Sequence, residues 1–277
     1  MSRYIPDDNL SYPVLISIDD RSGSGFYLNT NDGSYLVTAK HVLFEENSKN
    51  EKLTLWDKTA TLSSYSKDPT EKTPFVLGVN LEMAKVKAHP IFDIAIVKIL
   101  TFKEETPEGT WITKPADGIT QKQSGAKHLL VGVPLSSCRK YEDIQVSNEI
   151  FVFGYPNSLG IHEKSQDNNE LDYSRPLLRK GIIAGKNDLK RTIIIDCPIY
   201  QGNSGGLVME CEQVNFERKF FVLGVVTKFI PFVENMKSLQ YGTVNTNIEN
   251  SGYGIVVPID TILEFIQKEK QATTQPQ

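Results

Sequence analysis

The sequence contains few cysteines, few histidines and no long apolar run. Its 277 residues include 3 cysteines and 4 histidines. Three cysteines are too few, and odd in number, for a framework of disulfides. The longest apolar stretches, such as residues 220–226, are far shorter than the ~20 residues that a transmembrane helix needs, and the N-terminus lacks the apolar run of a signal peptide. We therefore expect a soluble cytoplasmic protein that does not bind a membrane.

An excess of charge of one sign is also missing. The chain carries 30 lysines and arginines against 34 aspartates and glutamates, which gives a net charge of −4. A nucleic-acid-binding protein usually presents a concentrated basic face, so no nucleic-acid partner is expected. The cysteines lack the spacing of metal ligands, and we expect neither a metal nor another cofactor. The apolar fraction of 39% is sufficient for a packed core.

Short runs of alternating apolar residues or of β-branched residues dominate the sequence. Turn signals such as Asn31-Asp32-Gly33 and Tyr155-Pro156-Asn157 separate these runs. Because no amphipathic helices lie between them, the pattern favours an all-β barrel or sandwich over alternating strands and helices. The candidate strands are residues 14–18, 25–28, 34–38, 52–56, 83–88, 94–99, 129–133, 149–153, 178–184, 192–196, 206–209, 220–227 and 254–257.

The last part of the sequence predicts a helix over residues 259–271. Apolar residues recur there at helical spacing, namely at Ile259, Ile262, Leu263 and Ile266. Thr261 and Glu264 have the spacing of a capping box, which marks the start of a helix. Two stretches are predicted to be loops: residues 101–123, which are rich in Glu, Pro, Gly and Thr, and residues 162–174, which are polar and show no apolar period. The first of them is expected to link two halves of the chain.

One glycine-rich segment has the composition of a nucleophile turn: Gln201-Gly202-Asn203-Ser204-Gly205-Gly206. Glycine permits the tight turn and the close backbone approach that an exposed serine and an oxyanion-binding pair of N–H groups require. The segment also fits the Gly-x-Ser-x-Gly elbow of α/β-hydrolases, in which the histidine follows the serine. Here all four histidines precede Ser204, which excludes that elbow. An ordinary glycine-rich turn between strands remains the simpler alternative.

The opposite chain order, histidine then aspartate then serine, is present. His41 follows an apolar run in Thr38-Ala39-Lys40-His41, and Asp93 begins the strand pattern Asp93-Ile94-Ala95-Ile96. Taken singly, each of these residues could be an ordinary residue of a strand end or a turn. Together with Ser204 and in this order, they resemble a trypsin-like serine protease of the chymotrypsin fold. The other three histidines have no comparable context and are expected at surface or structural positions.

The resemblance extends to the protease domain of the HtrA-like group and covers roughly residues 12–268. It rests on four segments: Gly23-Ser24-Gly25-Phe26-Tyr27-Leu28, Val152-Phe153-Gly154-Tyr155-Pro156, the serine segment with Asp196 before it, and Gly252-Tyr253-Gly254-Ile255-Val256-Val257-Pro258. It implies a single peptidase unit over residues 1–277, and this length is expected to leave no room for the PDZ domain that many HtrA-like proteases append. That unit would comprise two packed six-stranded antiparallel β-barrels, residues 10–115 and 125–258, and a C-terminal helix over residues 259–271.

The resemblance also implies roles for particular residues. Ser204 would attack the scissile carbonyl, His41 would accept its proton, and Asp93 would orient the imidazole. The N–H groups of Gly202 and Ser204 would form the oxyanion hole. The substrate would be a polypeptide bound as an extended strand along residues 226–228. The residues expected to contact it are Gln201, Val226, Thr227, Lys228 and Gly254.

Two departures from the wider family affect activation and specificity. Asn203 replaces the aspartate that pairs with a new N-terminus in zymogen-activated trypsins, so activation by N-terminal processing is not expected. Pro198 and Ile199 stand where a trypsin-type aspartate would lie, which favours a small or medium apolar residue before the cleaved bond. An active endopeptidase is the leading hypothesis. The alternative is a catalytically silent or latent peptide-binding module that requires an activating partner.

Overall fold

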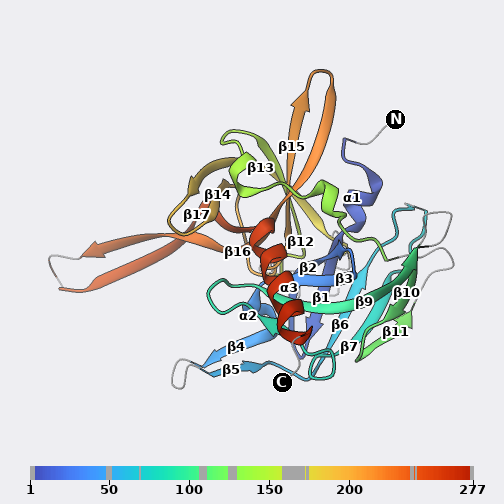
Figure 1. The fold of residues 1–277 in the computed structure, drawn as a ribbon. Helices are drawn as coiled ribbons and strands as arrows, with labels where there is room; N and C mark the ends of the chain where they lie inside the picture. The colour runs from blue at the N-terminus through green and yellow to red at the C-terminus, as the bar shows by residue number, and fades with distance from the viewer. Residues whose placement is uncertain are drawn as a thin grey trace.

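The computed structural model describes residues 4–47, 52–68, 70–105, 111–123, 130–157, 172, 175–237, 240 and 242–274. These residues form two antiparallel β-units, joined by a long connection and followed by a C-terminal helix (Figure 1). A short helix, α1 (Asp7–Ser11), precedes the first strand. Within the described part of the chain, no helix is long and apolar enough to cross a membrane.

The first unit is a nine-stranded sheet in the order β10-β9-β3-β2-β1-β6-β7-β11, with β8 beside β9. Its two edges come together at the turn of residues 116–118. There the N–H of Ala116 donates to the carbonyl of Ile99 at 2.9 Å, and the N–H of Asn80 donates to that of Gly118 at 2.8 Å. The strands are β1 (Pro13–Ile18), β2 (Arg21–Thr30), β3 (Gly33–Thr38), β6 (Thr59–Ser64), β7 (Phe75–Asn80), β8 (Lys87–Ala88), β9 (Ala95–Glu105), β10 (Trp111–Pro115) and β11 (Ile119–Gln123).

A short helix and a hairpin interrupt the first unit after β3. The helix is α2 (Lys40–Leu43), and the hairpin consists of β4 (Phe44–Asn47) and β5 (Lys52–Leu55). The connection to the second unit contains two single-turn 3-10 helices, η1 (Leu135–Ser137) and η2 (Tyr141–Asp143).

The second unit is a closed barrel of six strands in the order β12-β13-β14-β17-β16-β15. Two of its hairpins, β15–β16 and β16–β17, extend well beyond the barrel (Figure 1). The strands are β12 (Glu149–Gly154), β13 (Leu177–Asn187), β14 (Thr192–Asp196), β15 (Leu207–Val214), β16 (Glu217–Lys237) and β17 (Val244–Pro258), and the helix α3 (Ile259–Thr274) follows them.

The alternation of side chains along the strands produces separate cores. In β12, Val152 points into the second barrel while its neighbour Phe153 packs into a core that lies between the two units. Leu207 of β15 and Phe26 of β2 contribute to the same shared core, and the apolar stripe of α3 covers it. A third core fills the first unit. The two units are therefore packed through one continuous apolar layer that includes the C-terminal helix.

The predicted all-β, chymotrypsin-like fold with a C-terminal helix is confirmed, but the first unit has nine strands in place of six. The prediction that residues 101–123 form a linker is wrong. β9 continues to Glu105, and both β10 and β11 belong to the first sheet, so this unit extends beyond residue 115. β11 lies at the sheet edge with almost every side chain exposed. An edge strand of this kind has no apolar alternation for a sequence pattern to reveal.

Two further strand predictions fail, and one loop cannot be compared. Residues 83–88 are mostly turn, since only the short β8 is strand. In residues 129–133, only Val133 makes a β-bridge, to Leu28, while residue 129 lies outside the described residues. The predicted loop at residues 162–174 lies almost entirely outside the described residues.

The predicted apolar stripe of the C-terminal helix is buried, but the predicted capping box is wrong. The helix begins at Ile259, so Thr261 lies inside its first turn. The N–H of Thr261 donates to Asp260 Oδ1 at 2.8 Å, and Glu264 pairs with Arg191 at 3.2 Å instead of reaching back to the helix start. Because β17 ends at Pro258 and α3 begins at Ile259, no loop residue lies between them to cap the helix.

Substitution of the helix residue Ile262 by alanine should weaken the shared core. Ile262 is fully buried between the units, and large-to-small changes at such sites cost about 2–5 kcal/mol. Urea unfolding should detect a loss of this size for Ile262→Ala. The exposed Gln267→Ala, on the same helix, serves as the control and should change stability by less than about 0.5 kcal/mol. Equal effects of the two changes would contradict the shared core.

Candidate active site

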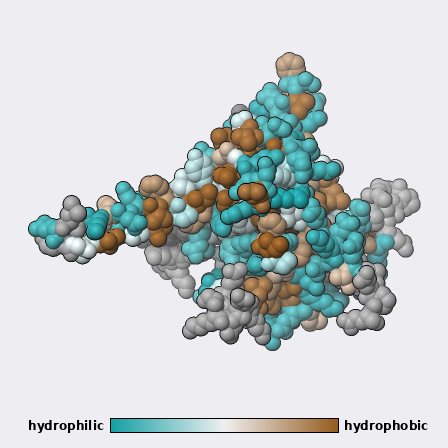
Figure 2. Space-filling view, turned by 60° about the vertical axis from the view of Figure 1, so that its left-hand side comes forward, coloured by the Kyte–Doolittle hydropathy of each residue, from teal (hydrophilic) through white to brown (hydrophobic). Residues whose placement is uncertain are grey.

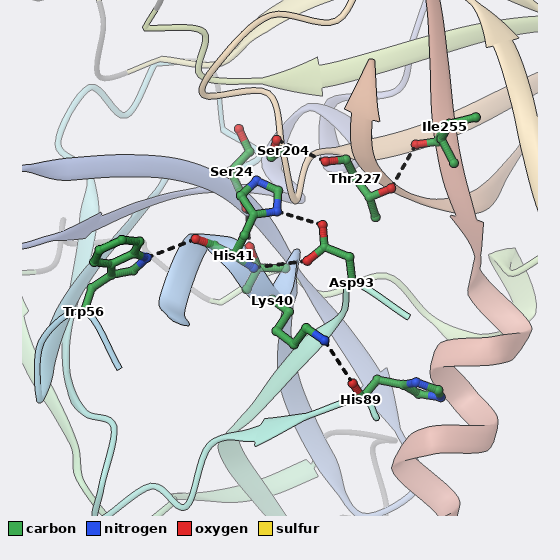
Figure 3. Close-up of polar contacts among 10 residues, drawn as sticks. Ser24, Lys40, His41, Trp56, His89, Asp93, Ser204, Thr227 and Ile255 are labelled. Carbon is green, nitrogen blue, oxygen red and sulfur yellow. Dashed lines mark hydrogen bonds and ion pairs between the residues drawn. The ribbon is translucent and has the colours of Figure 1, made fainter. Parts of the chain in front are cut away.

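The main chain of His41 is fixed at the edge of the first unit. His41 lies in α2, directly after β3, and its neighbours Val42 and Leu43 are buried in the core of the first unit. The indole Nε1 of Trp56 donates to the carbonyl of His41 at 3.1 Å (Figure 3). The imidazole is half-exposed. Its backbone is therefore fixed while its ring faces solvent.

Asp93 binds His41 at two points. Asp93 Oδ2 lies 2.7 Å from His41 Nδ1, and Asp93 Oδ1 accepts the backbone N–H of His41 at 3.1 Å (Figure 3). Burial alone would raise the pKa of the Asp93 carboxyl, but the hydrogen bonds and charge of His41 lower this pKa below its ordinary value. The ionised carboxylate favours a proton on Nδ1, and this leaves the lone pair of Nε2 available.

The glycine-rich segment forms the turn between β14 and β15. Gly202 has a φ of +89° and Gly205 a φ of +85°, values that favour glycine over all other residues. A Cβ atom on Gly202 would collide with the carbonyl of Tyr155, and one on Gly205 with the carbonyl of Ser24. The backbone therefore takes a path that only glycine permits at these two positions.

Two N–H groups of this turn remain available for a ligand. The N–H of Asn157 donates to the carbonyl of Gln201 at 2.9 Å. Because the N–H of a trans peptide points opposite to its carbonyl, the N–H of Gly202 points away from Asn157. Among the described residues, neither this N–H nor that of Ser204 has a hydrogen-bond partner. Within the described part of the chain, the turn thus carries two N–H donors without a partner.

The serine lies on the same cleft as the histidine and the aspartate. Ser204 Oγ donates to the carbonyl of Thr227 at 3.3 Å, and the described residues include no hydrogen bond between Ser204 and His41 (Figure 3). His41, Asp93 and Ser204 all line a cleft of about 1050 Å³. The structure therefore brings the three residues singled out in the sequence to one place, with the hydroxyl turned toward Thr227.

A family model for the trypsin-like peptidase domain matches residues 23–214, more than half of the chain. The chain belongs to this family. The match covers the first unit from β2 onward, including His41 and Asp93, and the serine turn. The resemblance to trypsin-like proteases is confirmed at the level of the family.

Solved structures similar to this peptidase domain include HtrA-type proteases. One is the HtrA-type protease AlgW with a tripeptide, at 15% identity, a TM-score of 0.47, and coverage of 93% of this chain and 60% of that one. Another is Deg5, at 18% identity, a TM-score of 0.48, and coverage of 93% and 88%. The domain thus spans about three fifths of the length of AlgW. A comparison of the sequence with curated proteins gives no match.

The cleft of the peptidase domain includes three of the five predicted substrate contacts, namely Gln201, Thr227 and Lys228. The other two do not line it. Val226 is buried in the second barrel, where its N–H and carbonyl bind Gly206 and Gly205. Gly254 faces the core of the second barrel, because a Cβ there would lie 3.1 Å from Ile195 Cγ1.

Apolar residues from two loops also line the cleft and were not predicted. Ile91 and Phe92 precede Asp93, and Leu189 lies in the turn between β13 and β14. Ile91 and Leu189 are highly exposed. The available signal was an isolated apolar residue in a polar turn for Leu189, and the apolar pair Ile91-Phe92 before Asp93 for Ile91. Both patterns are too common on protein surfaces to be specific.

Ser24 of β2 holds the serine turn from the opposite unit, a role that was not predicted from the sequence. Its buried hydroxyl donates to the carbonyl of Gly202 at 2.6 Å and accepts the N–H of Tyr155 at 2.9 Å. Its N–H donates to the carbonyl of Ser204 at 3.0 Å. The available signal was a small polar residue between two glycines in an apolar strand.

His89 supports the loop that carries Asp93. Its Nδ1 accepts the N–H groups of Ile91 at 3.1 Å and Phe92 at 2.9 Å. Its ring packs against Phe92 and against Phe265 of α3, with ring centroids 5.0 Å and 4.9 Å away. Because Nδ1 accepts two hydrogen bonds, this arrangement requires the neutral imidazole.

Removal of the Ser24 hydroxyl should destabilise the peptidase domain. Ser24→Ala leaves the buried carbonyl of Gly202 and the N–H of Tyr155 without this partner, at a cost of about 1–3 kcal/mol. Denaturant unfolding measures the effect. Ser17→Ala, on the exposed face of β1, is the matched control and should be nearly neutral. A Ser24→Ala protein as stable as the control would contradict the bridging role.

Acidification should loosen the loop before Asp93. Burial, together with the charges of Lys268 and Lys40, lowers the pKa of His89 below its ordinary value of 6.5. The unfolded chain therefore binds more protons than the native state below about pH 6.5, and stability falls as the pH decreases through that window. His89→Asn keeps an acceptor oxygen and removes the titration. Urea unfolding at pH 7 and pH 5 should show a smaller loss for this variant, and an equal loss would refute the role of His89.

Proposed function

We propose that this chain is a serine endopeptidase that hydrolyses peptide bonds in polypeptides through an acyl-enzyme intermediate. The observation that carries the proposal is the geometry of the cleft. His41 is bonded to Asp93 at 2.7 Å, Ser204 lies on the same cleft, and the N–H groups of Gly202 and Ser204 have no hydrogen-bond partner among the described residues. Membership of the trypsin-like peptidase domain family supports the same conclusion.

The proposed reaction uses each of these groups in turn. Ser204 Oγ attacks the scissile carbonyl carbon while His41 Nε2 accepts the hydroxyl proton. Asp93 holds the imidazole by Nδ1 and stabilises the imidazolium. The tetrahedral intermediate collapses when His41 returns the proton to the leaving amine, and the acyl group remains on Ser204. A water molecule, deprotonated by His41, then attacks the ester carbonyl. The bond to Ser204 Oγ breaks, His41 returns the proton to Ser204, and the acid is released.

The unpaired N–H groups would stabilise the negative charge that develops on the substrate oxygen. One such donor contributes about 3 kcal/mol to lowering the barrier. The donors are effective only if the turn keeps its shape before substrate binds. The positive φ angles of Gly202 and Gly205 and the hydrogen bonds from Ser24 and Asn157 support this preorganisation.

We propose a small or medium apolar residue before the cleaved bond. Ile199 lines the cleft where a trypsin-type acid is absent. Its side chain makes this wall of the cleft apolar, and it offers no charge to a lysine or arginine side chain. A substrate strand along Thr227 and Lys228 would present its side chain to this apolar wall.

A latent or catalytically silent module is the second candidate, and one observation favours it. Ser204 Oγ donates to Thr227 instead of to His41, so the nucleophile is turned away from its base. A substrate N–H that binds the carbonyl of Thr227 would displace the hydroxyl and return it toward His41. An activating partner that reshapes the turn would have the same effect.

A fluorophosphonate probe tests the proposed function directly. The wild-type protein should be labelled, Ser204→Ala should not be, and His41→Ala should react several orders of magnitude more slowly. Ser24→Ala should be labelled about tenfold more slowly, because it weakens the support of the oxyanion donors. Ser17→Ala is the control for a serine change elsewhere and should react as the wild type does.

Two outcomes would contradict the catalytic assignment. Normal labelling of His41→Ala would show that this histidine is not the base. Absence of labelling in folded wild-type protein would favour the silent or latent module. If labelling then appears when cell lysate is added, the protein is latent.

A further inference from the structure

The hairpin of β16 and β17 continues beyond the second barrel as a two-stranded arm, residues 228–237 and 244–253 (Figure 1). β15 pairs with β16 only as far as Val225, and β14 pairs with β17 only at residues 253–256. Beyond these points, the described parts of the two strands pair only with each other, out to Lys237 opposite Val244.

The arm exposes an unusual amount of apolar side chain. Val233 lies directly opposite Ile248, so the two share one face, while the adjacent Phe232 points to the other. Because apolar side chains lie on both faces of the arm, packing one face against the rest of the protein would leave those on the other face exposed. Figure 2 shows the resulting hydrophobic patches along the projecting arm. Six large side chains are between 39% and 64% exposed: Phe229, Phe232, Val233, Met236, Val244 and Ile248.

One edge of the arm begins beside Ser204, the proposed nucleophile. Val226 still binds the serine turn through its main chain, but the carbonyl of the next residue, Thr227, accepts Ser204 Oγ. Lys228 and Phe229 then line the cleft that also contains His41. From Thr227 to Lys237, this edge has no strand partner among the described residues. A single unpaired strand edge therefore leads from the cleft to the arm.

We propose that the arm binds the part of the substrate that precedes the cleaved bond, as an added β-strand rich in apolar side chains. This inference rests on the proposed peptidase function. A strand antiparallel to β16, the more frequent arrangement, would run from the tip of the arm toward Ser204. Residues N-terminal to the cleaved bond would then lie on the arm. At ~3.3 Å per residue, residues 228–237 offer an edge of about 33 Å.

The chemistry of the arm favours extended apolar segments over charged ones. Apolar side chains on both of its faces would contact both sets of alternating side chains of a bound strand. The charges of the arm balance, with Lys228 and Lys237 against Glu234 and Glu249. Pro231 lacks an N–H and removes one donor from the edge, so side-chain contacts would carry a larger share of the binding.

Because the arm is continuous with the cleft, we expect it to bind substrate and not a second copy of the chain. A peptide held at Ser204 has its preceding residues tethered beside the arm, so their binding is effectively intramolecular and gains from a high local concentration. In the described structure, no feature tethers a second copy of the chain beside this edge in the same way.

Peptides of different length test the proposal. We would compare a four-residue coumarin-amide peptide ending in alanine with two ten-residue versions, whose six added residues alternate Val and Thr or Gly and Ser. The Val-Thr peptide should have a kcat/KM about tenfold above that of the short peptide, because several apolar side chains gain contacts. The Gly-Ser peptide should gain less. Equal kcat/KM values for all three peptides would overturn the proposal.

A double variant tests whether the arm produces this gain. Val233→Lys with Ile248→Lys places two charges on one face, and the ratio of kcat/KM between the Val-Thr and short peptides should fall toward one. The matched control is Phe216→Lys, an equally non-conservative change at an exposed apolar residue in the turn of the β15–β16 hairpin. The control should keep the wild-type ratio. A ratio unchanged in the double variant would overturn the proposal.

Two further measurements separate the remaining outcomes. If no peptide is cleaved, the proposed function fails, and the arm is tested by fluorescence anisotropy of a labelled Val-Thr peptide on Ser204→Ala. Weaker binding after the double substitution would support the arm, and equal binding would overturn it. Light scattering of wild type and double variant completes the test. A molecular mass that falls in the variant would assign the arm to self-association and overturn the proposal.

Discussion

The candidate site depends on a hydrogen-bonded contact between two β-units that each hold only part of it. His41 and Asp93 belong to the first unit, while Ser204 and its neighbouring N–H groups belong to the second. Ser24 joins the two by binding the carbonyls of Gly202 and Ser204 from the opposite sheet. A small shift between the units would separate Ser204 from His41, and in enzymes generally a misplacement of about 1 Å is sufficient to impair catalysis.

The sequence predicted those features that depend on local pattern or on chain order. Alternating apolar runs indicated the all-β fold, and the order of His41, Asp93 and Ser204 distinguished this chain from α/β-hydrolases. Edge strands such as β11 were missed because their exposed side chains carry no apolar period. The bridging role of Ser24 was missed because its partners are far away in the chain, and no local pattern records a contact between residues 24 and 202.

Charged, hydrogen-bonding and apolar groups meet in the same cleft. The lowered pKa of Asp93 keeps a charge beside the imidazole, and the glycine turn leaves two donors without partners in the described structure. The apolar residues around them, among them Ile91 and Leu189, come from loops of both units. Val226 and Gly254 were expected at the cleft but face the interior, because strand alternation assigns every second residue to the barrel core.

The position of α3 in the chain has a consequence for biosynthesis. This helix follows every strand in the sequence, yet Ile259, Ile262 and Ile266 complete the core between the two units. On the ribosome, both sheets are therefore made before the residues that hold them together have emerged. The parts of the candidate site reach their final spacing only after α3 has left the ribosome, so the site is assembled late in synthesis.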